Sequence, residues 1–192
     1  MRSKIEANEY KDYILGFIFY KYLSEQEEQW LHSKGYEAEN IQEYVNENAP
    51  DAYSGKSNLQ QNLGYFISYE NLFSTWIQKG VDFSIDDVSV ALSAFNRLIS
   101  PTHKKVFEGI FQTLEVGLSK LGENAKMQSK AASDLIHLID EIPMNGRQDY
   151  DVLGFIYEYL LEKFASNAGK KAGEFYTPHE VSLLMSELIA EH

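Results

Sequence analysis

The feature that most constrains this chain is the helical spacing of its large apolar residues, which recurs along nearly its whole length. Tyr10, Tyr13 and Phe17 mark the first case, after a plausible N-cap at Asn8, and the pattern becomes polar over 24–29 before it ends near Gly35. The same period predicts later helices over residues 39–48, 72–79, 84–99, 107–121, 135–142, 153–164 and 178–188. A mainly α fold is therefore expected, without the alternating strands of a complete α/β domain.

Two stretches interrupt this pattern. Residues 50–64 are rich in Ser, Asn, Gln and Gly, which predicts a long loop. The run 65–69 is too short to decide between a strand and the lead into a helix. A polar connection at 144–150 is the best candidate for a domain boundary, and we expect Leu138 on the apolar face of the helix that precedes it.

The positions of the charged residues indicate helix caps and solvent-exposed faces rather than a catalytic site. Ser84 and Asp87 have the spacing of a capping box at a helix start. Adjacent acids such as Glu27 and Glu28 point in different directions on a helix, so a solvated face is predicted for them and not an acid/base pair. Residues 25–51 hold eight acids and one lysine, which indicates a solvated face or, as a minority option, a surface for a basic partner or a mimic of DNA charge.

Composition excludes several functional classes. The 192 residues carry 17 Lys and Arg against 29 Asp and Glu, a formal net charge of -12, so a self-sufficient binder of nucleic acid is not expected. The absence of cysteine excludes disulfides and thiolate chemistry, and no histidine pair has metal-ligand spacing, so no metal site is predicted. The longest apolar run, 13–20, is too short to span a membrane, and 1–12 does not resemble a signal peptide, which predicts a cytoplasmic protein.

The sharpest local motif is Thr177-Pro178-His179-Glu180 near the C-terminus. Thr177 can cap a helix whose first residue is Pro178, and Glu180 completes a capping box. An ordinary helix start explains this motif by itself. A helix N-terminus of this kind can also receive a carboxylate or a phosphate. Phe175 and Tyr176 could then offer an aromatic surface to the same ligand, or they could anchor the core.

Two pairs of blocks resemble the methyltransferase (modification) subunit of type I restriction–modification systems. The first comprises residues 7–16 and 20–24, and the second comprises 151–161 and 173–178. The resemblance implies a helical N-terminal domain over 1–148. It further implies that 149–192 begin the N6-adenine methyltransferase domain, as the first helices of a truncated Rossmann-like fold.

The same resemblance implies an activity, a cofactor and partners. Such subunits transfer a methyl group from S-adenosylmethionine to adenine N6 in DNA, together with a specificity subunit that reads the DNA and a restriction subunit. Many relatives carry Gln where this chain has Glu174 and Arg where it has His179. The side-chain contacts at these two positions are therefore expected to differ from those in the relatives, whereas the backbone contacts do not depend on the side chain. Carried over residue by residue, the implied cofactor-binding positions are Glu174, Phe175, Tyr176, Thr177, Pro178 and His179.

The remaining machinery of that family is not found in the sequence. Its cofactor loop needs closely spaced glycines, and none of the 12 glycines forms Gly-x-Gly. Its catalytic motif is Asn-Pro-Pro-aromatic, whereas the four prolines here are isolated. We therefore expect no catalytic residue, and interpret the chain as an inactive piece of a longer protein, cut at both ends, that contributes subunit and DNA contacts and one edge of the cofactor site. The alternative is a non-enzymatic acidic helical module that binds a basic protein.

Overall fold

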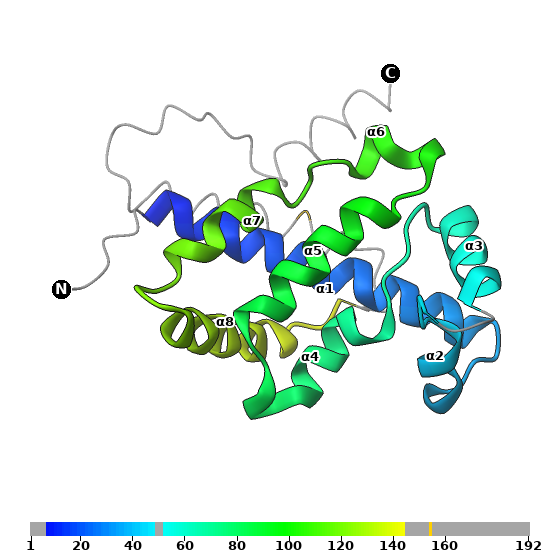
Figure 1. Cartoon of the computed structure of the whole chain (residues 1–192), viewed down its shortest axis with the longest axis horizontal. Coiled ribbons are helices and arrows are strands. Elements are labelled where there is room, and N and C mark those ends of the chain that lie inside the picture. Colours follow the sequence, from blue (N-terminus) through cyan, green and yellow to red (C-terminus); the bar gives the residue numbers. More distant parts are fainter. Residues whose placement is uncertain (1–6, 49–51, 145–153, 155–192) are drawn as a thin grey trace, which may run out of the picture.

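The described part of the chain is a bundle of helices around one long helix. The structure, a computed structural model, describes residues 7–48, 52–144 and 154. Within these residues there are helices and connections but no strand, which confirms the mainly α fold (Figure 1). The α-helices are α1 (Ala7–Ser33), α2 (Ala38–Tyr44), α3 (Ala52–Asn62), α4 (Phe73–Lys79), α5 (Ile85–Leu98), α6 (Lys104–Phe107), α7 (Gln112–Gly117) and α8 (Ala125–Asp140), and the short 3-10 turns are η1 (Tyr69–Asn71), η2 (Gly80–Asp82), η3 (Pro101–His103) and η4 (Leu118–Lys120).

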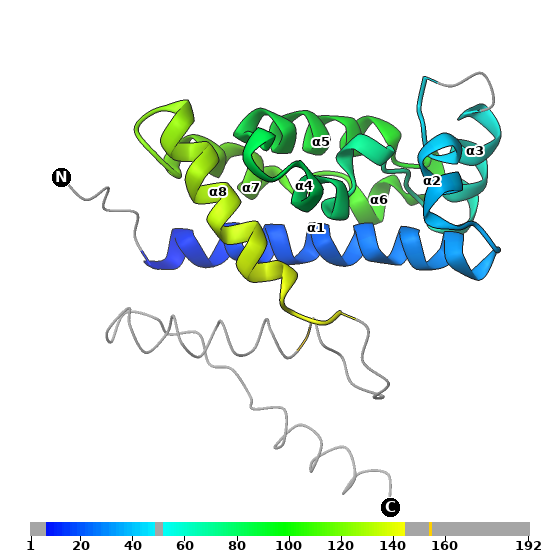
Figure 2. The same cartoon turned by 90° about the horizontal axis from the view of Figure 1, so that it is seen from below.

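Helix α1 is the spine on which the other helices pack. It runs the length of the domain in Figure 2, with α4, α7 and α8 against it. Tyr20 lies at the centre of the core, where its ring stacks on Trp76 at 4.7 Å between centroids and meets Phe111 at 5.3 Å. Burying such aromatic rings supplies much of the apolar area removed from water. No helix in the described residues is long and apolar enough to cross a membrane.

Helices α1 and α7 approach each other closely because glycines lie at their crossing. A Cβ added at Gly16 would lie 2.8 Å from Cβ of Leu114, and one at Gly117 would lie 2.0 Å from Cε1 of Tyr13. Real side chains are never this close, so the contact depends on hydrogen at both positions.

The prediction of a long loop over 50–64 is wrong, because residues 52–62 form α3. Among the side chains of α3 that the structure describes, Leu59 is completely buried and anchors the helix to the core. Gln60 adds a hydrogen bond from Nε2 to the Leu98 carbonyl at 2.8 Å, and Asn58 donates to the Tyr44 hydroxyl at 2.9 Å. Tertiary contacts therefore stabilise a helix that local propensity does not favour. Figure 1 shows α2 and α3 side by side at one end of the domain.

Two further expectations need correction. The single helix predicted over 107–121 is interrupted, since α6 ends at Phe107 and α7 begins at Gln112, with Gly109 at φ 76° in the turn between them. This positive φ is one that glycine adopts without strain. Leu138, expected on the buried face of its helix, is 65% exposed, because α8 turns Ala132, Ile136 and Ile139 toward the core instead.

The helices predicted at 72–79 and 84–99 are confirmed as α4 and α5. Helix α4 ends at Lys79, and the following Gly80 turns the chain out of the helix with φ 52°. At the start of α5, the Ser84 N–H donates to Oδ2 of Asp87 at 2.8 Å, as a capping box requires. Asp87 also accepts from Lys79 at 2.7 Å, so this carboxylate links the end of α4 to the start of α5. The run 65–69 is neither strand nor helix until η1 begins at Tyr69.

Candidate functional site

The six residues predicted to hold the cofactor, 174–179, lie outside the described residues, as does the second predicted domain from 149 onward, apart from Gly154. The notable chemistry of the described part is a row of polar side chains on the inner side of α1. We call Lys21, Ser24, Glu27 and Glu28 the α1 polar row. Three of them are almost fully buried, although polar side chains are usually exposed.

The α1 polar row accepts hydrogen bonds from residues 65–74, which lead from α3 through η1 into the first turn of α4. Oε2 of Glu27 accepts from the Ile67 N–H at 2.9 Å, and Oγ of Ser24 accepts from the Phe73 N–H at 2.8 Å. Glu28 accepts from the Ser74 hydroxyl at 2.6 Å. Buried N–H groups outside regular structure need partners of this kind. The side chains of α1 thus accept hydrogen bonds from backbone N–H groups of this segment, as the carbonyl groups of a neighbouring strand do in a sheet.

Two tyrosines, Tyr65 from the segment and Tyr20 from α1, add a hydrogen bond in each direction. The Tyr65 hydroxyl donates to the Leu23 carbonyl at 2.9 Å, and the Tyr20 hydroxyl donates to the Asn71 carbonyl at 3.0 Å. Both bonds are buried, where an unpaired hydroxyl would be costly. The segment is therefore held on α1 by hydrogen bonds in both directions.

Glu27 contradicts the prediction of a solvated acidic pair at 27–28. Its side chain has no solvent exposure, and its Oε1 has no hydrogen-bond partner among the described residues. Desolvation raises the pKa of the Glu27 carboxyl well above its ordinary value, against the opposing effect of the Ile67 N–H, and the negative charge of Glu28 raises it further. Desolvation also raises the pKa of Glu28, although its bond from Ser74 opposes the shift.

Lys21 connects α1 to the residues that follow α8. Its Nζ donates to the Ile142 carbonyl at 2.8 Å and forms an ion pair with Glu25 one turn along α1. The Lys21 side chain is only 3% exposed, so its charge is compensated by these two partners rather than by water. This lysine therefore fixes the end of α8 on the spine helix.

Replacing Ser24 with alanine is expected to lower the free energy of unfolding by about 1–2 kcal/mol. The reason is that Phe73 is the first residue of α4 and its buried N–H would lose its acceptor. Urea unfolding followed by circular dichroism measures the change. Ser33→Ala is the matched control, because Ser33 is exposed at the end of α1 and its hydroxyl donates to the Trp30 carbonyl in its own turn. We expect a change within about 0.5 kcal/mol for this variant. Equal losses in the two variants would contradict the capping role of Ser24.

The described residues also bear on metal binding and on proton exchange with a substrate. They contain no group of three or more acidic, histidine or cysteine residues that could hold a metal ion. The acid with the most strongly raised pKa, Glu27, is enclosed in the core, where its proton cannot reach a substrate.

Comparison with known proteins assigns this helical domain. The family model "HsdM N-terminal domain" matches residues 1–142, which is most of the chain. The chain belongs to the HsdM family. A second family model, "N-6 DNA Methylase", matches residues 148–192 of this HsdM chain.

Proteins similar to this HsdM chain have names that agree with the family. It is 26% identical to the Type I restriction enzyme MpnII methylase subunit of Mycoplasma pneumoniae, over 98% of the chain and 37% of that protein. It is 24% identical to the Type I restriction enzyme MjaIX methylase subunit of Methanocaldococcus jannaschii, over 98% of the chain and 33% of that protein. The chain thus spans about a third of the length of these relatives.

A solved structure shows the same arrangement of helices. The type I restriction-modification system methyltransferase subunit from Streptococcus thermophilus matches with a TM-score of 0.77 and 28% sequence identity, over 97% of the HsdM chain and 40% of that subunit. The predicted resemblance to type I methyltransferase subunits is therefore confirmed.

The α1 polar row was missed by the sequence prediction although a signal for it exists. Glu27 lies ten residues after Phe17 and four before Leu31, so it continues the face that buries both of these residues. An acidic residue at a position that faces the core indicates a buried carboxyl with a hydrogen-bond partner. The many acids near Glu27 in the sequence lead instead to the prediction of a solvated face.

Proposed function

We propose that this HsdM chain is the N-terminal part of a type I restriction–modification methyltransferase subunit. The complete subunit transfers a methyl group from S-adenosylmethionine to the N6 atom of adenine in DNA. The observation that carries the proposal is the order of the two family matches, an HsdM N-terminal domain over 1–142 followed directly by an N-6 DNA methylase over 148–192. A helical domain over 1–148 and the start of the catalytic domain over 149–192 fit this order.

In this proposal the helical domain contributes contacts and the second part contributes one edge of the cofactor site. Residues 174–179 hold the methionine end of S-adenosylmethionine in this proposal, because the capped helix start that the sequence predicts at Thr177 would offer free N–H groups to its carboxylate. The subunit works with a specificity subunit and a restriction subunit. Because the chain has a net charge of -12, its contact with DNA depends on a local basic strip or on the surface of a partner.

The 192-residue chain by itself is proposed to be inactive. Transfer to adenine N6 needs a residue that grips the extruded base, and the sequence contains neither Asn-Pro-Pro-aromatic nor a Gly-x-Gly cofactor loop. Affinity for S-adenosylmethionine should also be weak, since only one edge of the pocket is supplied.

Methyl transfer tests both parts of the proposal. The complete reading frame that contains this chain, purified with its specificity subunit, should transfer tritium from labelled S-adenosylmethionine to DNA. The 192-residue chain with the same partner should give no incorporation above a reaction without protein. Label on DNA from the chain alone would refute its inactivity, and a complete complex that labels no adenine would refute the proposed reaction.

A further inference from the structure

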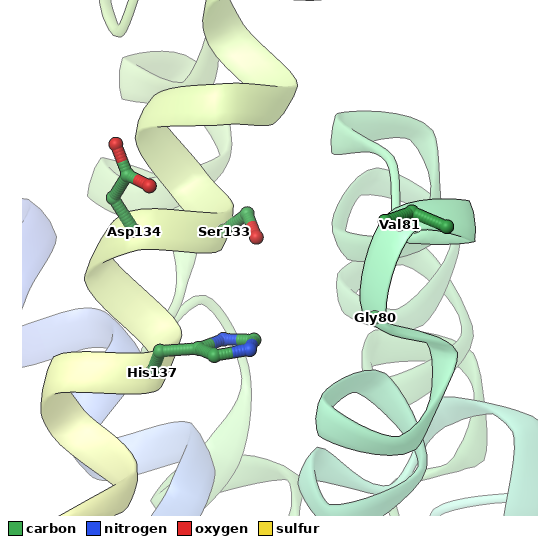
Figure 3. Close-up of a pocket in the computed structure, with 5 residues that line it drawn as sticks. All are labelled: Gly80, Val81, Ser133, Asp134 and His137. Atoms are coloured by element: carbon green, nitrogen blue, oxygen red, sulfur yellow. The ribbon is translucent and has the colours of Figure 1, made fainter.

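An open groove lies between the η2 turn and α8. It has a volume of about 460 Å³, and its lining residues are Gly80, Val81, Ser133, Asp134 and His137. Figure 3 shows the side chains of Ser133 and His137 directed from α8 toward the Gly80–Val81 turn, with Asp134 beside Ser133 on the same helix. None of these residues belongs to the α1 polar row or to the predicted cofactor site.

The two walls of the groove are a turn after α4 and one face of α8. On one side, Gly80 turns the chain at the end of α4 with φ 52°, and no atom lies within 4 Å of where its Cβ would be. On the other side, Ser129 accepts a hydrogen bond from the Ile85 N–H at 3.0 Å, which ties the start of α5 to α8 one turn before Ser133. Phe83 and Ile136 are buried beneath the walls, so the groove is part of the packed domain.

Val81 gives the groove an apolar rim. Its side chain is 99% exposed, the highest exposure among the large hydrophobic residues of the described part of the chain. A single exposed valine is ordinary on a protein surface, but this one stands beside a cavity into which a partner side chain can insert. Covering it would remove its whole apolar area from water.

The surroundings of the groove are acidic. The walls and the adjoining first turn of α5 carry five carboxylates and three lysines. Lys79 is bound to Asp87 at 2.7 Å, and Lys130 is bound to Asp134 at 3.3 Å. Three exposed carboxylates without an ion pair to any described residue therefore remain against the charge of Lys126. These three are Asp82, Asp86 and Asp140.

We propose that this groove binds a segment of another protein in which a lysine or arginine stands next to an apolar residue. The apolar residue covers Val81, and the cation lies among the carboxylates after its aliphatic stem passes along the groove. Nucleic acid does not suit the site, because its phosphates meet the same negative field. The inference goes beyond the proposed methyltransferase function and does not rest on it.

A defined peptide pair tests the groove with the full 192-residue chain. The probe is a fluorescently labelled 12-residue peptide of repeated Leu-Arg pairs, and the comparison peptide has Glu in place of Arg. Fluorescence anisotropy at low ionic strength should show saturable binding of the Arg peptide and none of the Glu peptide. Added salt should weaken the binding, since the attraction is between charges at the surface.

Variants locate the binding site on the molecule. Val81→Ser should weaken binding of the Arg peptide about five- to tenfold, because the apolar contact is lost. Val106→Ser, at a valine that is 64% exposed on α6, is the matched control and should leave the affinity unchanged. Asp82→Asn should weaken binding about two- to threefold, whereas Glu39→Gln, at an exposed acid on α2, should have no effect.

Each outcome decides the proposal. Losses at Val81 and Asp82 without losses at the control positions support it. Equal losses at the groove and control variants would show attraction to the acidic surface as a whole and would overturn it. Binding of the Glu peptide with similar affinity, or no binding of the Arg peptide at millimolar protein concentration, would overturn it as well. Methyl transfer enters none of these measurements, so they remain independent of the proposed function.

Discussion

Replacing Gly117 with alanine is expected to lower the free energy of unfolding by about 2–3 kcal/mol. The new Cβ would lie 2.0 Å from Cε1 of Tyr13, whose side chain is buried in the core. The backbone at Gly117 is ordinary for a helix, with φ -75° and ψ -20°, so no strain arises from the conformation itself. If the site were open, alanine would stabilise the helix by about 1 kcal/mol relative to glycine. A destabilising result would therefore indicate the steric clash with Tyr13, and a stabilising one its absence. Chemical unfolding followed by circular dichroism measures it.

A double-mutant cycle separates this steric effect from others. In the background Tyr13→Ala, the change Gly117→Ala should cost little, because the ring that it meets is gone. Gly35→Ala is the matched control, since Gly35 has φ 87° but no atom within 4 Å of the added Cβ; strain alone should cost about 1–2 kcal/mol there. A stabilising effect of Gly117→Ala in the unmodified chain would contradict the close crossing of α1 and α7.

Replacing Glu27 with glutamine is expected to stabilise the protein at neutral pH, by about 1–3 kcal/mol. Below the ordinary carboxyl pKa, Glu27 is protonated in both the folded and the unfolded state and carries no penalty. Its folded-state pKa is raised, so as pH increases the unfolded state loses the proton first. The stability of the wild type relative to Glu27→Gln therefore falls as pH rises from about 4.3 to the folded pKa, and is constant above it.

Melting temperatures of the two proteins at a series of pH values test this prediction. They should nearly coincide at pH 4, with the variant higher at pH 7.5 by about 2–4 °C for each kcal/mol. Glu28→Gln is the control at the neighbouring acid, where a partly exposed carboxylate bonded to Ser74 should give a smaller divergence. Parallel curves for wild type and Glu27→Gln would show that Glu27 is not a buried titrating group.

Sequence patterns predicted α1 and α5 because these helices carry their own evidence. Each places large apolar residues on one face, and α5 also has its capping box at Ser84 and Asp87. Helix α3 has no such evidence, since its sequence is largely polar; the buried Leu59 and hydrogen bonds to Tyr44 and Leu98 hold it in place. Distant contacts of this kind leave no periodic signal.

The candidate sites also divide into features that a local motif predicts and features that depend on distant contacts. The family resemblance could be predicted because it rests on contiguous blocks near both ends of the chain, whereas the cofactor positions 174–179 stay a prediction. The burial of Glu27 depends on the Ile67 N–H, 40 residues away, which composition cannot show. The groove at Val81 depends on how α8 rests against the end of α4, and no motif in either segment encodes that arrangement.

The long sequence separation of the bonds to α1 has a consequence for synthesis on the ribosome. Tyr20, Leu23, Ser24 and Glu27 bond to residues 40 to 51 positions later in the chain. At about 5–20 residues per second, the nascent α1 therefore waits some seconds with a carboxylate and a hydroxyl turned toward water before their partners emerge. Until then Glu27 is ionised and hydrated like any exposed acid, so its dehydration belongs to the late, long-range step of folding and should slow that step as pH rises.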